Sequence, residues 1–159
     1  MNLPNRKLPR LRGFDYSDQN FYYVTICTCD KKYLFGTIEQ LNIYGKIAQQ
    51  ELINIPLHYK GITIDKYVIM PNHIHVIIII GCCEKAERSR PFPTLSTIVG
   101  LYKSGVSKVI HKISPEIEVW QKSFYDEIIR NEQSYREIWE YIDGNPLQWR
   151  LDKYFTDSV

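Results

Sequence analysis

The hydrophobic residues along the chain fall into segments with the spacing of strands and segments with the spacing of helices. Residues 21–29 are rich in β-branched and aromatic side chains, which predicts a first strand. Residues 41–55 carry apolar side chains at near-helical intervals, which predicts a helix stopped by Pro56. Residues 62–70 and 73–80 are again strand-like, and the two residues between them predict a tight turn and an antiparallel hairpin.

The second half of the chain continues this alternation. After a polar loop at 84–93, apolar residues recur at helical spacing behind Thr94, a candidate N-cap: Leu95, Ile98, Val99, Tyr102, Val106, Val109 and Ile110. Residues 119–129 predict a further strand, and residues 132–142 predict a last helix that residues 144–146 end. This order of elements, with antiparallel pairing, predicts an α+β fold of ferredoxin-like type, an antiparallel sheet with helices packed on it.

The length and composition are those of a single globular domain. The chain has 159 residues, of which 44% are hydrophobic and 24% charged. We expect one domain over 1–159, with a basic extended arm at 1–18 and a C-terminal tail at 147–159. No apolar run is long enough to cross a membrane and no signal-peptide pattern is present, so we expect no membrane partner and a cytoplasmic location. The net charge of +2 does not by itself indicate a polyanionic partner.

The four cysteines do not follow the usual spacing of a zinc site. Cys27 and Cys29 are separated by one residue, and Cys82 and Cys83 are adjacent. In a reducing compartment the first interpretation is that they are packing residues. The alternative is a zinc site that combines cysteines with histidines.

Two histidines begin the most apolar of the strand-like segments. Residues i and i+2 of a strand point to the same face, about 7 Å apart along the chain, so His73 and His75 can bind one metal ion. The aliphatic run that follows predicts a central strand buried on both faces. Two polar rings there cost free energy unless a ligand or hydrogen bonds satisfy them. A pair satisfied only by hydrogen bonds is the other interpretation.

The last helix offers two further polar groups at helical spacing. Tyr141 and Asn145 are four residues apart, so they lie on one helical face. Asn145 can give an amide oxygen to a metal while Tyr141 presents its hydroxyl beside it. Two nitrogens and one oxygen with open positions suit Mg²⁺ or Mn²⁺, although imidazoles also accept Zn²⁺. On spacing alone, a tyrosine such as Tyr141 is more often a half-buried helix aromatic, and an asparagine before proline, as at Asn145, is more often a helix stop.

Several separated motifs resemble one protein family. The segment from Met70 to His75 resembles the HUH motif of single-strand DNA transposases, most closely that of the REP-associated tyrosine transposases. The resemblance covers most of the chain and continues, in the same order, at residues 14–17, 23–28, 34–36, 120–126 and 141–146. Several motifs in the right order are far more specific than any one of them.

The resemblance implies a role for each residue of the candidate site. His73 and His75 correspond to metal ligands, Tyr141 to the catalytic nucleophile, and Asn145 to a third metal ligand. Gly144 departs from the family, where Asn or another non-glycine residue is commoner. A glycine at this position can unwind the final helical turn and move Asn145.

The activity implied by the resemblance is cleavage and rejoining of single-stranded DNA at hairpin-forming repeats. Tyr141 would attack a phosphorus and form a 5′-phosphotyrosine, with Mg²⁺ or Mn²⁺ positioning the phosphate. The partner would be single-stranded DNA with palindromic repeats, and relatives include both homodimers and monomers. We expect phosphate contacts from five basic residues: Arg10, Arg12, Lys103, Lys108 and Arg130.

Two other functions remain open on the sequence. One is a catalytically silent protein that binds nucleic-acid hairpins, although binding alone would require neither Tyr141 nor the histidines. The other is a metal-dependent hydrolase in which Cys82 or Cys83 completes a zinc site. The hydrolase would hold zinc tightly and form no covalent adduct with DNA.

Overall fold

The computed structural model describes residues 20–81 and 92–157. Four strands form one sheet: β1 (Asn20–Cys27), β2 (Ile62–Met70), β3 (His73–Ile80) and β4 (Tyr125–Ile129). Their order in the sheet is β2-β3-β1-β4, and all neighbouring pairs are antiparallel. The predicted α+β, ferredoxin-like antiparallel sheet is therefore confirmed, with the two histidines on β3, a central strand. Residues 1–18, with Arg10 and Arg12, and Cys82 and Cys83 lie outside the described residues.

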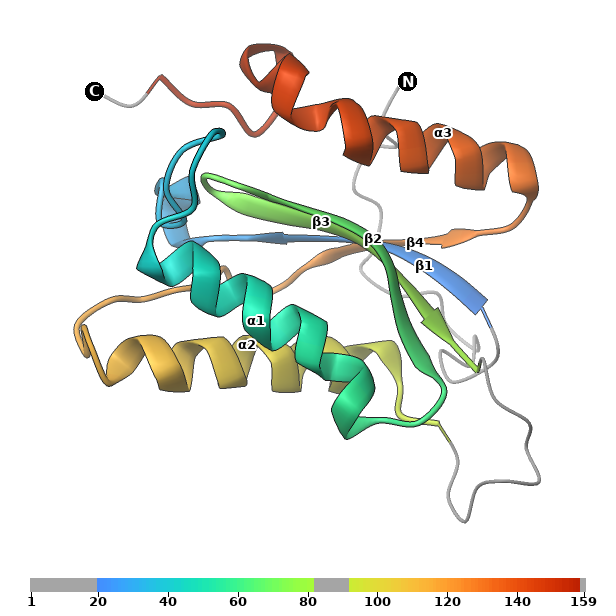
Figure 1. The fold of residues 1–159 in the computed structure, drawn as a ribbon, viewed down its shortest axis with the longest axis horizontal. Helices are drawn as coiled ribbons and strands as arrows, with labels where there is room; N and C mark the ends of the chain where they lie inside the picture. The colour runs from blue at the N-terminus through green and yellow to red at the C-terminus, as the bar shows by residue number, and fades with distance from the viewer. Residues whose placement is uncertain (1–19, 82–91, 158–159) are drawn as a thin grey trace.

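The helices divide between the two faces of the sheet, as Figure 1 shows. The helices α1 (Ile43–His58) and α2 (Leu95–His111) lie against one face, and α3 (Glu132–Gly144) lies against the other. Short 3₁₀ segments follow β1 and α3, as η1 (Cys29–Lys31) and η3 (Asn145–Leu151).

The strands contribute side chains to two hydrophobic clusters, because successive side chains of a strand point to opposite faces of the sheet. On β3, Ile74, Val76, Ile78 and Ile80 belong to the large core with α1 and α2. Ile77 faces the other way and packs in a small cluster with Ile138 and Ile142 of α3. Odd-numbered residues of β3, including both histidines, therefore share the face that α3 covers.

Several predicted boundaries shift for identifiable reasons. The helix predicted at 41–55 begins at Ile43, because the Asn42 side chain accepts a hydrogen bond from the Gly45 amide (2.9 Å) and caps it. Pro56 does not stop it, and this prediction was wrong. The helix runs on to His58, and the Tyr59 amide still bonds to the carbonyl of Ile55 (3.2 Å).

The strand predicted at 119–129 is shorter than expected. Only Tyr125–Ile129 pairs continuously with β1, and Trp120 makes an isolated bridge to Thr28. The Trp120 ring instead turns into the large core, where its Nε1–H donates to the Lys103 carbonyl (3.0 Å). The helix α2 begins where expected, with the Thr94 hydroxyl accepting from the Thr97 amide (3.2 Å).

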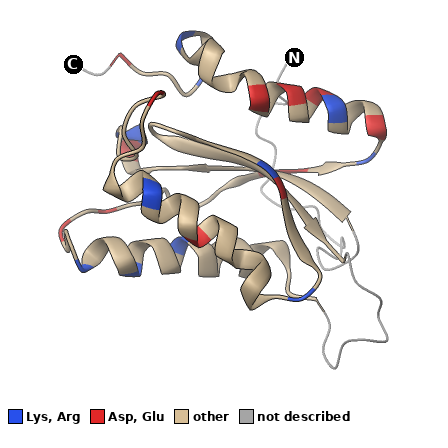
Figure 2. Cartoon of the chain, viewed as in Figure 1, with Lys and Arg blue, Asp and Glu red and all other residues tan. Residues whose placement is uncertain are grey.

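The outer surface of α3 carries mainly negative charge, visible as red along this helix in Figure 2. Four acids and one base lie on it, all of them exposed: Glu132, Glu137, Glu140, Asp143 and Arg136. No helix among the described residues is both long and apolar enough to span a membrane.

Candidate active site

The two histidines lie side by side at the start of β3 and are completely buried. The hairpin register places His73 opposite Met70 of β2, and β1 places Thr25 opposite His75. The two Nε2 atoms are 3.0 Å apart, and the ring centroids are 4.5 Å apart. The strand spacing predicted from the sequence thus brings two ring nitrogens to one point.

The tautomer of His73 follows from its contact with Asn72. The Asn72 amide nitrogen donates to two carbonyls, those of Tyr154 (2.7 Å) and Lys31 (3.2 Å). Its Oδ1 is therefore an acceptor, and it lies 2.7 Å from Nδ1 of His73. The Nδ1 atom must carry the hydrogen, which leaves the lone pair of Nε2 available as a ligand.

His75 is held in a similar way by two hydroxyl groups. Its Nδ1 is 2.9 Å from the Tyr23 hydroxyl and 2.9 Å from Oγ1 of Thr25. Burial lowers the pKa of His75, and burial together with the neighbouring His75 ring lowers the pKa of His73 further. Both imidazoles are therefore neutral at neutral pH, which is the form that binds metal.

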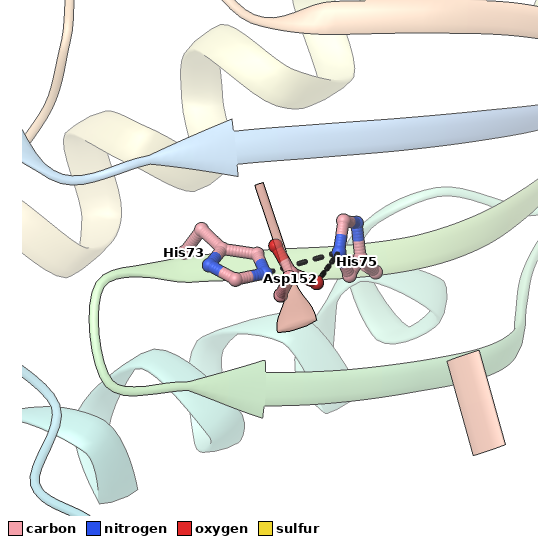
Figure 3. Close-up of side chains that lie close together, drawn as sticks. All are labelled: His73, His75 and Asp152. Atoms are coloured by element: carbon pink, nitrogen blue, oxygen red, sulfur yellow. Dashed lines mark hydrogen bonds and ion pairs between the residues drawn. The ribbon is translucent and has the colours of Figure 1, made fainter. Parts of the chain in front are cut away.

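A carboxylate completes the cluster, and the sequence did not single it out. Figure 3 shows Asp152 beside both imidazoles. Its Oδ2 is 4.0 Å from Nε2 of His75, and the ligand atoms of His73, His75 and Asp152 all lie within 4.8 Å of one another. Burial opposes ionisation of Asp152, but the neighbouring His75 ring and a hydrogen bond from the Tyr154 amide (2.8 Å) hold its pKa well below the usual value.

Tyr141 reaches this cluster from α3. Its hydroxyl donates to Oδ2 of Asp152 (3.0 Å), and its ring meets the His75 ring edge-on with centroids 5.3 Å apart. Burial and the adjacent carboxylate raise the pKa of Tyr141. The phenol is therefore protonated at neutral pH, and its proton already points at an acceptor. All of these groups belong to one chain.

Asn145 lies next to Tyr141 and Asp152, at the junction of α3 and η3. Its amide nitrogen donates to Oδ2 of Asp152 (2.6 Å), and the side chain is almost fully buried. Its Oδ1 has no hydrogen-bond partner among the residues that the structure describes. Gly144 does not unwind the turn, because its φ of −83° and ψ of −8° are helical and Asn145 follows in helical geometry.

The donor set fits a divalent cation. Two Nε2 atoms 3.0 Å apart repel each other unless a cation or a proton lies between them. Two ligands at right angles on an octahedral ion, each about 2.1 Å from it, are also about 3.0 Å apart. A carboxylate and the unpartnered amide oxygen of Asn145 lie beside the pair. Buried polar atoms without partners are costly, and a bound ion would satisfy them.

The basic residues that we associated with DNA do not gather at this site. Lys103 of α2 donates to the carbonyl of Gln121 (2.5 Å), and exposed Lys108 lies on the same helix, across the sheet from the histidines. Arg130 is exposed and follows the end of β4 that is remote from the histidines. Tyr125, at the other end of β4, is the residue that pairs with Thr25, which in turn pairs with His75. Their contacts with DNA stay a prediction.

The fold is similar to those of two solved proteins. A solved REP-associated tyrosine transposase bound to a REP hairpin superimposes with a TM-score of 0.64, covering 93% of this chain and 77% of that one at 18% identity. A candidate transposase from Deinococcus radiodurans superimposes with a TM-score of 0.53, covering 86% of this chain and 97% of that one at 14% identity. No family model matches the sequence.

A protein of Haemophilus influenzae, described as uncharacterized, gives the family by sequence. The two chains are 38% identical over 170 aligned positions, which cover 96% of this chain and 94% of the other. The chain therefore belongs to the same family as this Haemophilus protein.

Asp152 and Tyr154 are two of the site residues that sequence reasoning missed. Both lie in 147–159, which we described only as a tail. The signal that could have found them is spacing: Tyr141, Asn145 and Trp149 are each four residues apart, and Trp149 is buried. This pattern continues the inner face of α3 through η3 and delivers Asp152 to the histidines.

Proposed function

We propose that this protein cleaves and rejoins single-stranded DNA through a covalent 5′-phosphotyrosine on Tyr141. The observation that carries the proposal is the position of the Tyr141 hydroxyl, which donates to the same carboxylate that lies against the histidine pair. The transposase fold supports it. A protein that only binds DNA needs no phenol, carboxylate and imidazole pair buried together.

Asp152 is the group that accepts the proton of the nucleophile. As the Tyr141 oxygen bonds to phosphorus, its proton passes to Oδ2 of Asp152, which already accepts it in a hydrogen bond. The bond from phosphorus to the 3′ oxygen breaks, and that oxygen leaves as a hydroxyl after taking up a proton. In the reverse step a second 3′-hydroxyl attacks the phosphotyrosine, and Tyr141 recovers its proton. No external energy source is needed, because one phosphodiester replaces another.

A divalent cation, Mg²⁺ or Mn²⁺, would be held by Nε2 of His73 and His75, with Asp152 and the Asn145 oxygen beside it. When bound, it supplies positive charge that positions the phosphate and stabilises the charge developing on it. The protein itself positions the groups that would hold the cation. Asn72, Tyr23 and Thr25 fix the two imidazoles, and burial shields both rings from bulk solvent.

The proposed partner is single-stranded DNA that carries hairpin-forming repeats. The negative outer surface of α3 would repel a polyanion, so the strand would approach Tyr141 from the side of β4 and the C-terminal segment. The histidines, tyrosine and carboxylate come from one chain, so a monomer contains a whole site.

The test is a denaturing gel with labelled single-stranded DNA taken from either side of the gene, in the presence of Mg²⁺ or Mn²⁺. The wild-type protein should form an adduct that resists denaturation. Tyr141→Phe should form none while it still binds the same DNA. Tyr135→Phe is the matched control, because Tyr135 lies on the same helix and donates to Asp65 instead (2.6 Å).

The same gel distinguishes the other two functions. Cleaved products without an adduct would support a metal-dependent hydrolase. A mobility shift without any cleavage would support a hairpin-binding protein. Adduct formation by Tyr141→Phe would remove Tyr141 from the mechanism.

A further inference from the structure

A cavity of about 300 Å³ opens beside the candidate active site. It lies between the end of β1, the segment before β4 and the C-terminal segment. Side chains from all three contribute to its wall, among them Gln121, Ser123, Tyr125, Lys153 and Tyr154. Its volume is at the small end of the range of pockets that bind small molecules, about 300–1,000 Å³.

The cavity shares its wall with the catalytic cluster. The Tyr154 ring, which lines the cavity, lies against the His73 ring with centroids 4.5 Å apart. Thr25 also lines the cavity, and its Oγ1 contacts Nδ1 of His75. A group inside the cavity would therefore be separated from the histidine pair by a single side chain, that of Tyr154 or Thr25.

The lining combines the groups that recognise a nucleotide. Tyr125 and Tyr154 supply aromatic surfaces, on which bases stack. Lys153 brings its ammonium group to 4.9 Å from the Tyr154 ring centroid and 5.6 Å from that of Tyr125. Lys31 lies at the same place, 5.8 Å from the Tyr154 centroid. Two cations beside stacking surfaces match a base that is linked to phosphates.

Gln121 supplies a donor and an acceptor on a fixed support. Its backbone amide donates to the Cys27 carbonyl (3.1 Å), and its carbonyl accepts from the Lys103 ammonium (2.5 Å). Its side-chain amide makes no hydrogen bond to the other described residues, so it is available to a ligand. An amide of this kind can read the edge of a base through paired hydrogen bonds. The Lys103 ammonium therefore also holds the cavity wall in place.

We propose that this cavity binds the base of a nucleotide next to the cleaved phosphate, with Lys31 and Lys153 on the neighbouring phosphates. The inference rests on the proposed function of the adjacent site. It adds that part of the sequence selectivity resides in a protein pocket that contains Gln121. The base is drawn out of the strand, stacked on tyrosine and read by the Gln121 amide.

The first experiment couples a change in the pocket to a change in the DNA. Single bases within a few nucleotides of the cleavage site are replaced, one at a time, by an abasic residue, and adduct formation is measured for wild type and Gln121→Ala. At one position, loss of the base should slow wild type about tenfold and have almost no further effect on Gln121→Ala. Gln133→Ala, an exposed glutamine of α3 outside the cavity, should behave as wild type at every position. Independent effects of Gln121→Ala and base loss at all positions would overturn the inference while leaving the transferase activity in place.

A second measurement follows DNA binding and does not depend on catalysis. Tyr141→Phe, with and without Gln121→Ala, is titrated with short oligonucleotides of a single base type, dA, dC, dG or dT. The wild-type pocket should favour one base about tenfold, and Gln121→Ala should remove that preference while Gln133→Ala keeps it. If no DNA forms an adduct but this preference is present, the proposed function fails and the pocket stands. The same affinities for all four bases in every variant would overturn the pocket.

Discussion

The two faces of the sheet bury different kinds of side chain. Toward α1 and α2, the strands contribute an apolar core, in which Val24, Ile26, Ile74 and Val76 are almost inaccessible to solvent. Toward α3, the same strands contribute imidazoles and hydroxyl groups, with only a small apolar cluster behind them. A single strand, β3, supplies both faces with alternate residues.

This difference explains how a small domain can stay folded although its site buries polar groups that lower its stability. Two buried imidazoles and a buried carboxylate lower stability unless every polar atom finds a partner. The face under α1 and α2 can compensate, because each large aliphatic side chain removed from water contributes about 1.5–3 kcal/mol. One face therefore stabilises the sheet, and the other can hold a set of buried polar groups that lowers stability.

The largest contrast should come from neighbouring residues of β3. His75→Ala should lower Mn²⁺ affinity by more than about 100-fold, since changes in supporting residues alone cost about 10–100-fold. Ile74→Ala should leave Mn²⁺ affinity almost unchanged and lower the free energy of unfolding by about 2–5 kcal/mol. Calorimetric metal titration and denaturant unfolding measure the two quantities. Equal loss of metal affinity in both variants would contradict the separation of the faces.

Asp152 should matter mainly for catalysis. Asp152→Asn keeps the size of the side chain but removes the charged acceptor of the Tyr141 proton, so adduct formation should slow by about 10²–10⁴-fold. Asp143→Asn is the control, because Asp143 is exposed on α3 and, among the described residues, forms an ion pair only with Lys66 (2.6 Å). Rates of adduct formation in single-turnover gels decide the point. Similar rates for Asp152→Asn and wild type would exclude proton transfer to this carboxylate.

Asn72 should act through the metal site. Asn72→Ala removes the acceptor that sets the His73 tautomer, so Mn²⁺ affinity should fall by about 10–100-fold. Asn54→Ala serves as the control on α1, where the side chain accepts from Gln50 (3.0 Å), a residue of the same helix. The calorimetric titration used for His75 applies here. Unchanged affinity in Asn72→Ala would mean that His73 keeps its tautomer without this hydrogen bond.

The smallest effect should be a gain of stability at Gly144. Its backbone is helical and nothing lies within 4 Å of an added Cβ, so Gly144→Ala should raise the free energy of unfolding by about 0.4–1 kcal/mol. Gly36→Ala should do the opposite, because Gly36 has a φ of +107° and its Cβ would lie 2.5 Å from the Gln40 carbonyl oxygen. Thermal unfolding of both variants measures these opposite changes in stability. Destabilisation by Gly144→Ala would show that the α3–η3 junction needs a glycine.

Hydrophobic periodicity predicted most of the fold. The hairpin at residues 62–80 and the helix behind Thr94 were found because their patterns are long and their turn and capping residues are distinct. Pro56 misled, because a proline near a helix end removes one hydrogen bond without preventing a last turn. Residues 119–124 misled because apolar side chains that enter a core from a loop have the same composition as a strand.

The site was half predictable. His73, His75, Tyr141 and Asn145 are recognisable because their spacing is local to one strand and one helix. The spacing from Tyr141 to Trp149 indicates only that this segment packs inward. The contact of Asp152 with the histidines depends on the tertiary path of η3, which spacing does not fix. The hydroxyl groups of Tyr23 and Thr25 likewise become partners of His75 only through the pairing of β1 with β3.

The hydrogen bonds of Asn72 reach across the chain, to Lys31 on one side and Tyr154 on the other. Asn72 aligns the His73 imidazole, and the Tyr154 carbonyl that holds Asn72 in place is synthesised 82 positions later. During translation the histidine strand and even the tyrosine helix emerge before the last partner exists. A nascent or truncated chain that ends before Asp152 would lack the proton acceptor and this anchor. The proposed cleavage activity would then arise only after Asp152 and Tyr154 have been synthesised.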